Sequence, residues 1–357
     1  MNYDNLMKEC FDLARKGAGK VLTNPMVGAI LVKDGEIIAK GYHKSFTDDH
    51  AEIDCFNNLK KSAEGATLIV NLEPCSHFGK HPPCVDEVIR RKVKRVVISN
   101  IDTNPKVDGL SKLKNAGIEV ITGVLEDEGK KLNEKFFFNM ENKRPLVALK
   151  YAQSLDGKIA TGSFDSKWIT NDESRAYVHK LRSEYDAILV GANTLRQDNP
   201  RLTSRIEGGV NPYRIILSDK LEIDKDREVF RENSDKKTYI ATISDKDIDI
   251  NAEVIRCKEK DGRVDLKDLL NKLYDRNIGS VLVEGGSLVN NSFLEEDLVD
   301  KIYQFMAPII VSGKDSRSAF IGEGAKFIKD AKRFSIDDIK RFGIDVMFEV
   351  NNVYRNS

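Results

Sequence analysis

The sequence has 357 residues, 40% of them hydrophobic and 32% charged, a composition that suits about two globular domains and excludes a mostly disordered chain. Lys and Arg together number 57, and so do Asp and Glu, so the net charge is zero and no basic field favours sequence-independent binding to nucleic acid. The charged N-terminal segment lacks the apolar stretch of a signal peptide, and no apolar run reaches the roughly 18 residues of a membrane span, so we expect a cytoplasmic protein with no membrane partner. Five cysteines are an odd and small number, which argues against a disulfide framework.

Helix and strand patterns alternate through the first part of the chain. Helical spacing of apolar residues predicts helices over 3–16, 50–59, 82–91, 110–116 and 126–138. Short apolar runs predict strands over 27–32, 37–39, 67–70, 95–98 and 119–122, and Asp34-Gly35 predicts a hairpin turn between the first two. This alternation indicates an α/β sheet covered by helices on both faces.

A polar segment over 139–145 ends in Pro145, which stops any preceding helix, so we place a domain boundary between residues 1–144 and 145–357. The second part again alternates, with strands expected at 146–152, 187–190, 214–217, 238–241, 280–283, 301–306 and 346–350. Helices are expected at 171–183, 265–274 and 287–294, which indicates a second α/β domain. The polar stretch 219–262 is the least informative.

The first domain contains a metal-binding pattern formed by His50, Cys75 and Cys84. One imidazole and two thiolates suit a tetrahedral Zn²⁺ that keeps one position open for water, whose pKa such an ion lowers to about 7. Glu52, two residues after His50, is placed to carry protons, provided that both lie at a helix start, since positions i and i+2 of a regular helix point apart. Cys84 follows two prolines, as at a helix N-terminus, where the helix dipole favours a thiolate.

Two other interpretations of this pattern remain. A structural zinc would take a fourth ligand, which His77 or His81 is able to supply, or the two cysteines are unrelated buried thiols. The order of H-x-E and P-C is that of zinc deaminases, although their usual P-C-x-x-C is replaced here by a spacer of SHFGKHPP. The remaining cysteines have no partner pattern and are expected to be small buried hydrophobes: Cys10, Cys55 and Cys257.

The long spacer resembles that of the riboflavin-pathway pyrimidine deaminases, whose motif is P-C-S-H-x-G-x-T-P-P-C. Residues 74–84 read PCSHFGKHPPC, with His81 in place of the usual Thr; 24–28 (NPMVG) and 41–43 (GYH) also match, and Thr47 stands where Gly is usual. The resemblance implies a cytidine-deaminase-like α/β/α domain in which Asn24 hydrogen-bonds the pyrimidine. It also implies that His43, His77 and Lys80 line the ribose-phosphate side, although Lys80 is alternatively a solvated surface lysine.

No G-x-G-x-x-G follows a strand in the second domain, so a Rossmann nucleotide site is not indicated. Residues 284–287 (EGGS) fall between a predicted strand and a predicted helix, where free backbone N–H groups suit a dinucleotide phosphate. Taken alone this is weak evidence, because most Gly-Gly pairs are only turns.

The ordered set of segments 150–158, 166–170, 179–182, 186–191, 198–205 and 283–287 is similar to the C-terminal domain of the bifunctional riboflavin-pathway deaminase–reductases. The similarity extends from about Tyr3 to about Phe348 and implies a dihydrofolate-reductase-like α/β fold and a homo-oligomer, dimer or tetramer, formed through this domain. It implies NADPH contacts at Ala152, Trp168, Thr170, Thr194, Asp198, Gly286, Ser287, Leu288, Val289, Asn290, Asn291 and Ser292. It implies substrate contacts at Ser166, Arg182, Leu202, Arg205 and Glu284.

Several of these residues have a second interpretation. Arg182 and Arg205 suit phosphate clamps because guanidinium binds phosphate bidentately, but each is alternatively part of a surface salt bridge. Lys150 and Glu284 are candidates for assisting proton transfer, and Lys150 is alternatively a paired structural lysine. Trp168 is a cofactor contact or a core residue. Ser218-Asp219 inverts an Asp-Ser pair of the family, which puts a cofactor contact there in doubt.

The sequence therefore predicts a two-domain riboflavin-biosynthesis enzyme that acts on a phosphorylated pyrimidine ribotide. A zinc site with Glu52 as proton carrier would hydrolyse the 2-amino group of 2,5-diamino-6-(5-phosphoribosylamino)pyrimidin-4-one. NADPH would then reduce the ribosyl group of 5-amino-6-(5-phosphoribosylamino)uracil to ribityl. The alternatives are a nucleic-acid base deaminase, which needs a basic groove, a zinc-stapled binding protein without catalysis, and a chain with one active and one degenerate domain.

Overall fold

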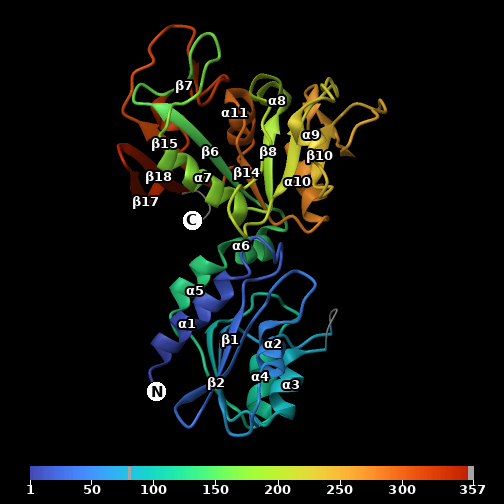
Figure 1. Cartoon of the computed structure of the whole chain (residues 1–357), viewed down its shortest axis with the longest axis vertical. Helices are drawn as coiled ribbons and strands as arrows, with labels where there is room; N and C mark the ends of the chain where they lie inside the picture. The colour runs from blue at the N-terminus through green and yellow to red at the C-terminus, as the bar shows by residue number, and fades with distance from the viewer. Residues whose placement is uncertain (79–81, 353–357) are drawn as a thin grey trace. The chain divides into compact units, whose positions relative to one another are not determined.

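The computed structural model describes residues 1–78 and 82–352 (Figure 1). The chain divides into two compact units, Met1–Lys143 and Arg144–Ser357. The last helix of the first unit ends at Asn142, and the next residue, Lys143, adopts a left-handed φ of 52°. Within the described ranges, no helix combines the length and apolar content that crossing a membrane requires.

The described part of the first unit forms a five-stranded sheet in the order β2-β1-β3-β4-β5. β1 pairs antiparallel with β2 and β3, whereas β3, β4 and β5 run parallel. The strands are β1 (Gly28–Lys33), β2 (Glu36–Tyr42), β3 (Thr67–Leu72), β4 (Arg95–Asn100) and β5 (Glu119–Ile121). The helices are α1 (Tyr3–Arg15), α2 (Ala51–Asn57), α3 (Cys84–Arg90), α4 (Gly109–Asn115), α5 (Glu126–Leu132) and α6 (Glu134–Asn142).

Helices cover both faces of this sheet, as expected from the alternation of elements. Successive residues of β1 point to opposite faces: Ile30 and Val32 belong to a core with Met7 and Phe11 of α1. Leu31 belongs to a second core with residues of α2, α3 and α4. α1 and α5 lie on one side of the sheet and α2, α3 and α4 on the other (Figure 1). The layers place the N-terminal ends of α2 and α3, with His50 and Cys84, on the same face.

The prediction of one helix over 126–138 is wrong, because the chain breaks between α5 and α6 at Asn133. The backbone there leaves helical geometry, with φ −105° and ψ 26°. Asn133 Oδ1 accepts a hydrogen bond from Met26 N at 2.8 Å, and Asn133 Nδ2 donates to Met26 O at 3.0 Å. These bonds tie the break between the two helices to the segment after Asn24.

In the second unit, the described residues form a nine-stranded sheet in the order β11-β10-β9-β8-β14-β6-β15-β18-β17. The strands from β11 to β15 run parallel, and β18 and β17 add antiparallel. The sheet strands are β6 (Leu146–Ser154), β8 (Ala187–Gly191), β9 (Tyr213–Leu217), β10 (Thr238–Thr242), β11 (Glu253–Arg256), β14 (Ser280–Val283), β15 (Lys301–Ala307), β17 (Phe334–Phe342) and β18 (Asp345–Asn352). Two short pairs are β12 (Glu259–Lys260) with β13 (Arg263–Val264), and β7 (Lys158–Ala160) with β16 (Arg317–Ser318).

The helices of this unit are α7 (Asp172–Glu184), α8 (Ala192–Asp198), α9 (Glu228–Arg231), α10 (Leu266–Tyr274), α11 (Ser287–Glu295) and the 3₁₀ helix η1 (Ile328–Asp330). α8, α9, β7, β11, β12, β13, β16, β17 and η1 were not predicted. β17 was not predicted because it is an edge strand whose side chains are largely exposed, so its sequence has no clear alternation of apolar and polar residues. The parallel strands β8 and β14 are neighbours, so their carboxyl ends place α8 and the loop at Glu284 together.

Candidate functional sites

Three metal-binding side chains of the first unit converge: His50, Cys75 and Cys84, whose ligand atoms all lie within 4.8 Å of one another. His50 caps α2, Cys84 opens α3, and Cys75 lies in the loop after β3. His50 Nδ1 lies 3.5 Å from Cys75 Sγ and 3.3 Å from Cys84 Sγ. The starts of α2 and α3 and the loop after β3 therefore bring an imidazole and two thiols to one point, a donor set that suits tetrahedral zinc with one open position.

The same helix start buries Glu52, which is 3% exposed and lies within hydrogen-bonding reach of the Cys84 thiol. Burial raises the pKa of Glu52 to about 7, although the neighbouring His50 opposes the shift. The hydrogen bond from Cys84, together with that from His50, lowers the pKa of Cys75. The expected placement of His50 and Glu52 at one helix start is therefore present in the structure.

Asn24 and His43 meet beside this cluster. Asn24 Nδ2 lies 3.1 Å from His43 Nε2, and His43 Nδ1 lies 3.0 Å from the carbonyl oxygen of Asp49. The His43 ring packs edge-on against the His50 ring, with 5.7 Å between centroids. This arrangement places two of the predicted substrate-binding side chains next to the metal-binding cluster.

His77 lies in the loop after Cys75 and is half-buried. Among the described residues the metal-binding cluster does not include it, and its Nδ1 is buried without a hydrogen-bond partner there. The predicted contact Lys80, and the alternative ligand His81, lie outside the described residues.

Sequence reasoning missed two carboxylates near the loop that holds Cys75 and His77. Glu73 is 5% exposed, accepts hydrogen bonds from Leu110 N at 2.9 Å and Asp102 N at 3.2 Å, and so fixes the loop after β4. Burial raises the pKa of Asp102, and His77 opposes that shift. The position of Glu73, directly before Pro74-Cys75, is the only signal that the sequence offers for this pair.

The remaining cysteines were expected to be small buried hydrophobes. Cys10 and Cys55 are buried as expected, whereas Cys257 is only partly buried. Burial raises the pKa of all three thiols.

In the second unit, a buried ion pair joins α7 to the end of β14. Arg182 Nε donates to Glu284 Oε1 at 2.7 Å and Arg182 Nη2 donates to Glu284 Oε2 at 2.9 Å. The side chains are only 15% and 10% exposed, so the alternative of a surface salt bridge is wrong for Arg182. Burial opposes ionisation of Glu284, but Arg182 and Lys150 outweigh it and lower its pKa to about 2.

Lys150 projects from β6 and lies 5.7 Å from the Phe305 ring centroid. Burial lowers the pKa of Lys150, while Glu284 raises it. Lys150, Arg182 and Glu284 thus form one electrostatic group, although they come from three separate elements.

The loop after α8 approaches this group through Thr203, whose carbonyl oxygen lies 3.4 Å from Arg182 Nη1. Leu202 is buried and Arg205 is exposed, and both adopt left-handed backbone with φ near 56° and 55°. His179, one turn before Arg182 on α7, also hydrogen-bonds the backbone of Thr203; sequence reasoning did not select it. These contacts hold the segment that presents Arg205.

The Gly-Gly turn before α11 packs closely against its neighbours. A Cβ on Gly285 would lie 2.7 Å from Val289 Cβ, and one on Gly286 would lie 3.6 Å from Thr194 Oγ1. Gly286 caps α11 with no side-chain hydrogen bond, so the first N–H groups of that helix keep their donors available for a ligand. The turn therefore forms a cradle that a side chain would fill.

The side chains of α11 that follow are largely engaged within the protein. Ser287 donates to Ser318 O, Asn290 to Ala319 O, Asn291 to Glu295 and Ser292 to Leu288 O. Leu288 is 50% exposed and Val289 packs against the core. A ligand at this helix would accordingly meet backbone groups more than these polar side chains.

The other predicted contacts of the second unit lie in loops, in β6 and in α8, which contains Thr194 and Asp198. Trp168 is 68% exposed, with the Arg175 guanidinium 4.6 Å from its ring centroid, so the alternative of a core residue is wrong. Burial raises the pKa of Asp198, and Lys167 opposes the shift. Four other predicted contacts are partly exposed: Ala152, Ser166, Thr170 and Thr194. At the doubtful Ser218-Asp219 pair, Asp219 Oδ1 accepts a hydrogen bond from Val264 N at 2.9 Å.

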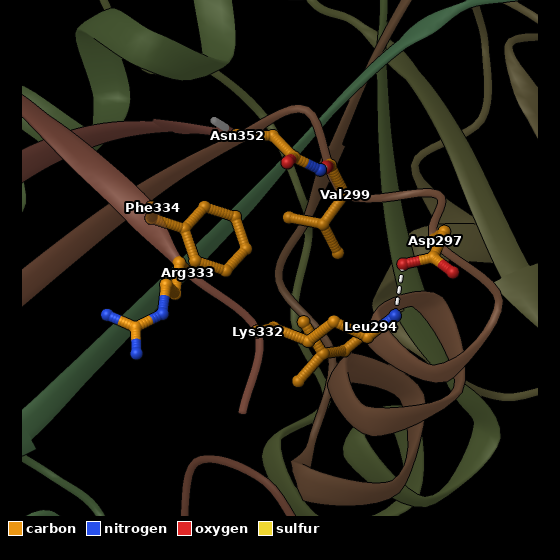
Figure 2. A pocket seen from close by; sticks show the side chains of 7 residues that line it. All are labelled: Leu294, Asp297, Val299, Lys332, Arg333, Phe334 and Asn352. Carbon is orange, nitrogen blue, oxygen red and sulfur yellow. Dashed lines mark hydrogen bonds and ion pairs between the residues drawn. The ribbon is translucent and has the colours of Figure 1, made fainter. Parts of the chain in front are cut away.

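A small hollow also lies between the end of α11 and the start of β17 (Figure 2). Its cavity volume is about 10 Å³, room for about one water molecule and far below the roughly 300 Å³ of a small ligand pocket. A hydrogen bond from Lys332 to Asp297 crosses its edge (Figure 2). None of the predicted site residues lines it.

The fold of the first unit and its metal-binding side chains together define a class of protein. A sheet layered between helices, with a His and a buried Glu at one helix start, a Cys at another and a second Cys in the loop after a strand, is a zinc-binding deaminase domain, here joined to a second α/β domain. Residues 1–100 match the family described as the cytidine and deoxycytidylate deaminase zinc-binding region. Residues 145–348 match the RibD C-terminal domain.

Whole-chain relatives have the same organisation. The riboflavin biosynthesis protein RibD of Actinobacillus pleuropneumoniae is 40% identical over 352 residues, covering 96% of this chain and 93% of the relative. RibD of Aquifex aeolicus is 41% identical over 353 residues and covers 96% of each. The solved diaminohydroxyphosphoribosylaminopyrimidine deaminase/5-amino-6-(5-phosphoribosylamino)uracil reductase of Thermotoga maritima superimposes with a TM-score of 0.89, at 41% identity and 98% coverage of both chains.

The chain belongs to the RibD family of bifunctional deaminase/reductases of riboflavin biosynthesis. It is accordingly an enzyme with a zinc-binding deaminase domain and a reductase domain. This finding favours the predicted function over a nucleic-acid base deaminase and over a binding protein without catalysis.

Proposed function

We propose that the first unit removes the 2-amino group of 2,5-diamino-6-(5-phosphoribosylamino)pyrimidin-4-one by hydrolysis. We propose further that the second unit reduces the ribosyl group of the product, 5-amino-6-(5-phosphoribosylamino)uracil, with NADPH. The observation that carries the proposal is the convergence of His50, Cys75 and Cys84 with the buried Glu52. The substrates named for the similar Thermotoga maritima enzyme support the assignment of these reactions.

The metal-binding residues fit Zn²⁺, because one nitrogen and two sulfur donors within 4.8 Å leave a fourth tetrahedral position for water. Zinc bound by His50, Cys75 and Cys84 would activate that water as the nucleophile. Glu52 would accept the two protons of the water in turn, and would pass the first to the ring nitrogen and the second to the amino group that leaves as ammonia. Burial, which raises the pKa of Glu52 to about 7, suits a group that must both accept and donate a proton near neutrality.

Substrate recognition in the first unit is assigned to Asn24, which binds the pyrimidine, and to His43, His77 and Lys80 on the ribose-phosphate side. Asn24 and His43 contact each other next to the His50 ring, so both lie beside the metal-binding cluster. A hydrogen bond from Asn24 to the pyrimidine would orient the carbon that bears the 2-amino group.

The second unit fits NADPH at the N-terminus of α11, because free N–H groups and the side-chain-free Gly285-Gly286 turn suit a phosphate. The assigned cofactor contacts are Ala152, Trp168, Thr170, Thr194, Asp198 and residues 286–292. NADPH bound there would supply hydride to the sugar C1′. We assign proton delivery to Lys150, whose pKa is lowered by burial, and the orientation of Lys150 to Glu284.

Binding of the substrate in the second unit is assigned to five residues, Ser166, Arg182, Leu202, Arg205 and Glu284. Arg182 already uses three of its five N–H donors on Glu284 and Thr203 O. The exposed Arg205 is therefore the better candidate for a direct phosphate clamp, and Arg182 contributes charge and holds Glu284 in place.

The proposed organisation includes a homo-oligomer, a dimer or a tetramer, formed through the reductase domain. The edge strand β17 and the turn after it expose three isoleucines, Ile336 at 61%, Ile339 at 55% and Ile344 at 71%. An edge strand with exposed apolar side chains pairs readily with a second copy of itself, which supports this proposal. We also assign the deaminase domain to residues 1–144 and the reductase domain to 145–357. The free state of all five cysteines supports a reducing, cytoplasmic location.

The proposal is tested by incubating zinc-loaded protein with the diaminopyrimidine ribotide and measuring ammonia, then adding NADPH to the same sample and following its oxidation. Ammonia release in proportion to substrate, followed by NADPH oxidation, supports both assignments. Release of ammonia without NADPH oxidation would indicate a degenerate reductase. Absence of ammonia, together with NADPH oxidation when preformed uracil product is supplied, would indicate a degenerate deaminase. Absence of both reactions in folded, zinc-loaded protein would refute the proposal.

A further inference from the structure

We propose that Asp54 is a positioning residue of the deaminase site, which sets His43 against the helix that carries His50 and Glu52. This inference rests on the proposed deamination. Neither the metal-binding pattern nor the substrate contacts assigned above include Asp54.

Asp54 lies one turn after His50 on α2, with its N–H bonded to the His50 carbonyl oxygen at 2.9 Å. The residue is only 8% exposed. Its carboxylate accepts a hydrogen bond from Tyr42 N at 3.1 Å and one from Lys44 Nζ at 2.6 Å. One carboxylate thus binds both residues that flank His43 in the sequence.

The backbone beside this carboxylate packs directly on the helix. A Cβ on Gly41 would lie 2.2 Å from Cys55 N and 2.6 Å from the Ala51 carbonyl oxygen. The close approach at Gly41 fixes the distance between β2 and α2, and the hydrogen bonds to Asp54 tie the residues on both sides of His43 to the helix.

The remaining contacts of His43 leave its ring direction dependent on these hydrogen bonds. Its N–H bonds the Val27 carbonyl oxygen at 2.9 Å, and its ring contacts Asn24 and the carbonyl of Asp49. A shift of Tyr42 and Lys44 along α2 would therefore turn the ring relative to Asn24. The metal-binding side chains come from the starts of α2 and α3 and from the loop at Cys75, so they do not depend on that shift.

The ion pair between Lys44 and Asp54 contributes less to holding this segment than the hydrogen bond from the Tyr42 amide. The Lys44 side chain is half exposed, and exposed ion pairs contribute little. The buried bond to the Tyr42 amide has no such screening, so the acceptor oxygen of Asp54 matters more than its charge.

The test compares Asp54→Ala, which removes both bonds, with Asp54→Asn, which keeps an acceptor for Tyr42 N, and with Lys44→Met, which removes only the ammonium. The matched control is Asp12→Asn, because the Asp12 side chain lies on the exposed face of α1. For zinc-loaded Asp54→Ala we expect the KM for the diaminopyrimidine ribotide to rise about tenfold with kcat changed less than about threefold. Asp54→Asn and Lys44→Met are expected to stay within about threefold of wild type, and NADPH-dependent reduction of preformed product is expected to be unchanged in all variants.

A wild-type KM in zinc-loaded Asp54→Ala would overturn the inference, and so would a fall of kcat and zinc content together with no change in KM. If the wild type itself releases no ammonia, the proposed function fails and the crystal structure of Asp54→Ala decides the inference. A His43 ring displaced from the Asp49 carbonyl with His50, Cys75 and Cys84 in place supports it, and an unmoved ring refutes it.

Discussion

Replacing Glu284 by Gln perturbs the second unit at a buried ion pair, the one that joins Glu284 to Arg182. The variant keeps the shape of the side chain but leaves Arg182, which is 15% exposed, without its counter-charge. The pKa of Glu284 falls from an ordinary 4.5 to about 2 in the folded chain, a shift that corresponds to about 3 kcal/mol of stabilisation. That figure lies at the lower end of the roughly 3–5 kcal/mol lost when one partner of a buried pair is removed.

The assay is thermal unfolding of the second unit at neutral pH. For a domain of this size, about 3 kcal/mol lowers Tm by roughly 6–12 °C. Glu228→Gln is the matched control, because Glu228 pairs with Arg201 on the surface and an exposed pair contributes about 1 kcal/mol or less. Replacing Arg182 and Glu284 together by apolar residues is expected to recover much of the loss, because no buried charge is left unpaired.

The pH dependence has a definite sign. A carboxyl whose folded pKa is depressed stabilises the fold above its unfolded pKa, so the contribution of Glu284 is complete above pH 4.5 and declines as the pH falls toward 2. Wild type and Glu284→Gln should therefore converge in stability at acid pH. A Tm of Glu284→Gln equal to that of Glu228→Gln at neutral pH would refute the reasoning.

Three further predictions concern the reductase domain. Lys150→Met is expected to lower the kcat of reduction about a hundredfold with little change in the KM for NADPH, and a wild-type kcat would exclude Lys150 as the proton donor. Gly285→Ala, whose Cβ would meet Val289, is expected to raise the KM for NADPH and to lower Tm, which steady-state kinetics and calorimetry check together; unchanged values would contradict the cradle. Ile339→Glu, on the exposed face of β17, is expected to halve the mass seen by light scattering, and an unchanged mass would exclude this edge from the interface.

The metal-binding cluster could be predicted from sequence because its chemistry depends on residue types in a fixed order. His50, Cys75 and Cys84 stand at helix starts and a strand end that local patterns already indicate, and Glu52 follows from its spacing to His50. The alternation of strands and helices similarly predicted the two α/β units.

Long-range pairing could not be predicted in the same way. Arg182 and Glu284 are 102 residues apart, and the resemblance placed both at the substrate without indicating that they bind each other. Asn133 interrupts a strongly helical pattern, and its side chain binds Met26, which is 107 residues earlier in the chain. Trp168 is exposed although single tryptophans are often core residues, because it lies in a loop before α7.

The most direct test of the account is the effect of Glu52→Gln on the two activities of one chain. Gln keeps the size of the side chain but cannot accept and return a proton, so we predict zinc content as in wild type and ammonia release reduced by about a thousandfold or more. Reduction of preformed 5-amino-6-(5-phosphoribosylamino)uracil by NADPH should proceed at the wild-type rate. Ammonia release at the wild-type rate from zinc-loaded Glu52→Gln would contradict the assignment of the deaminase site.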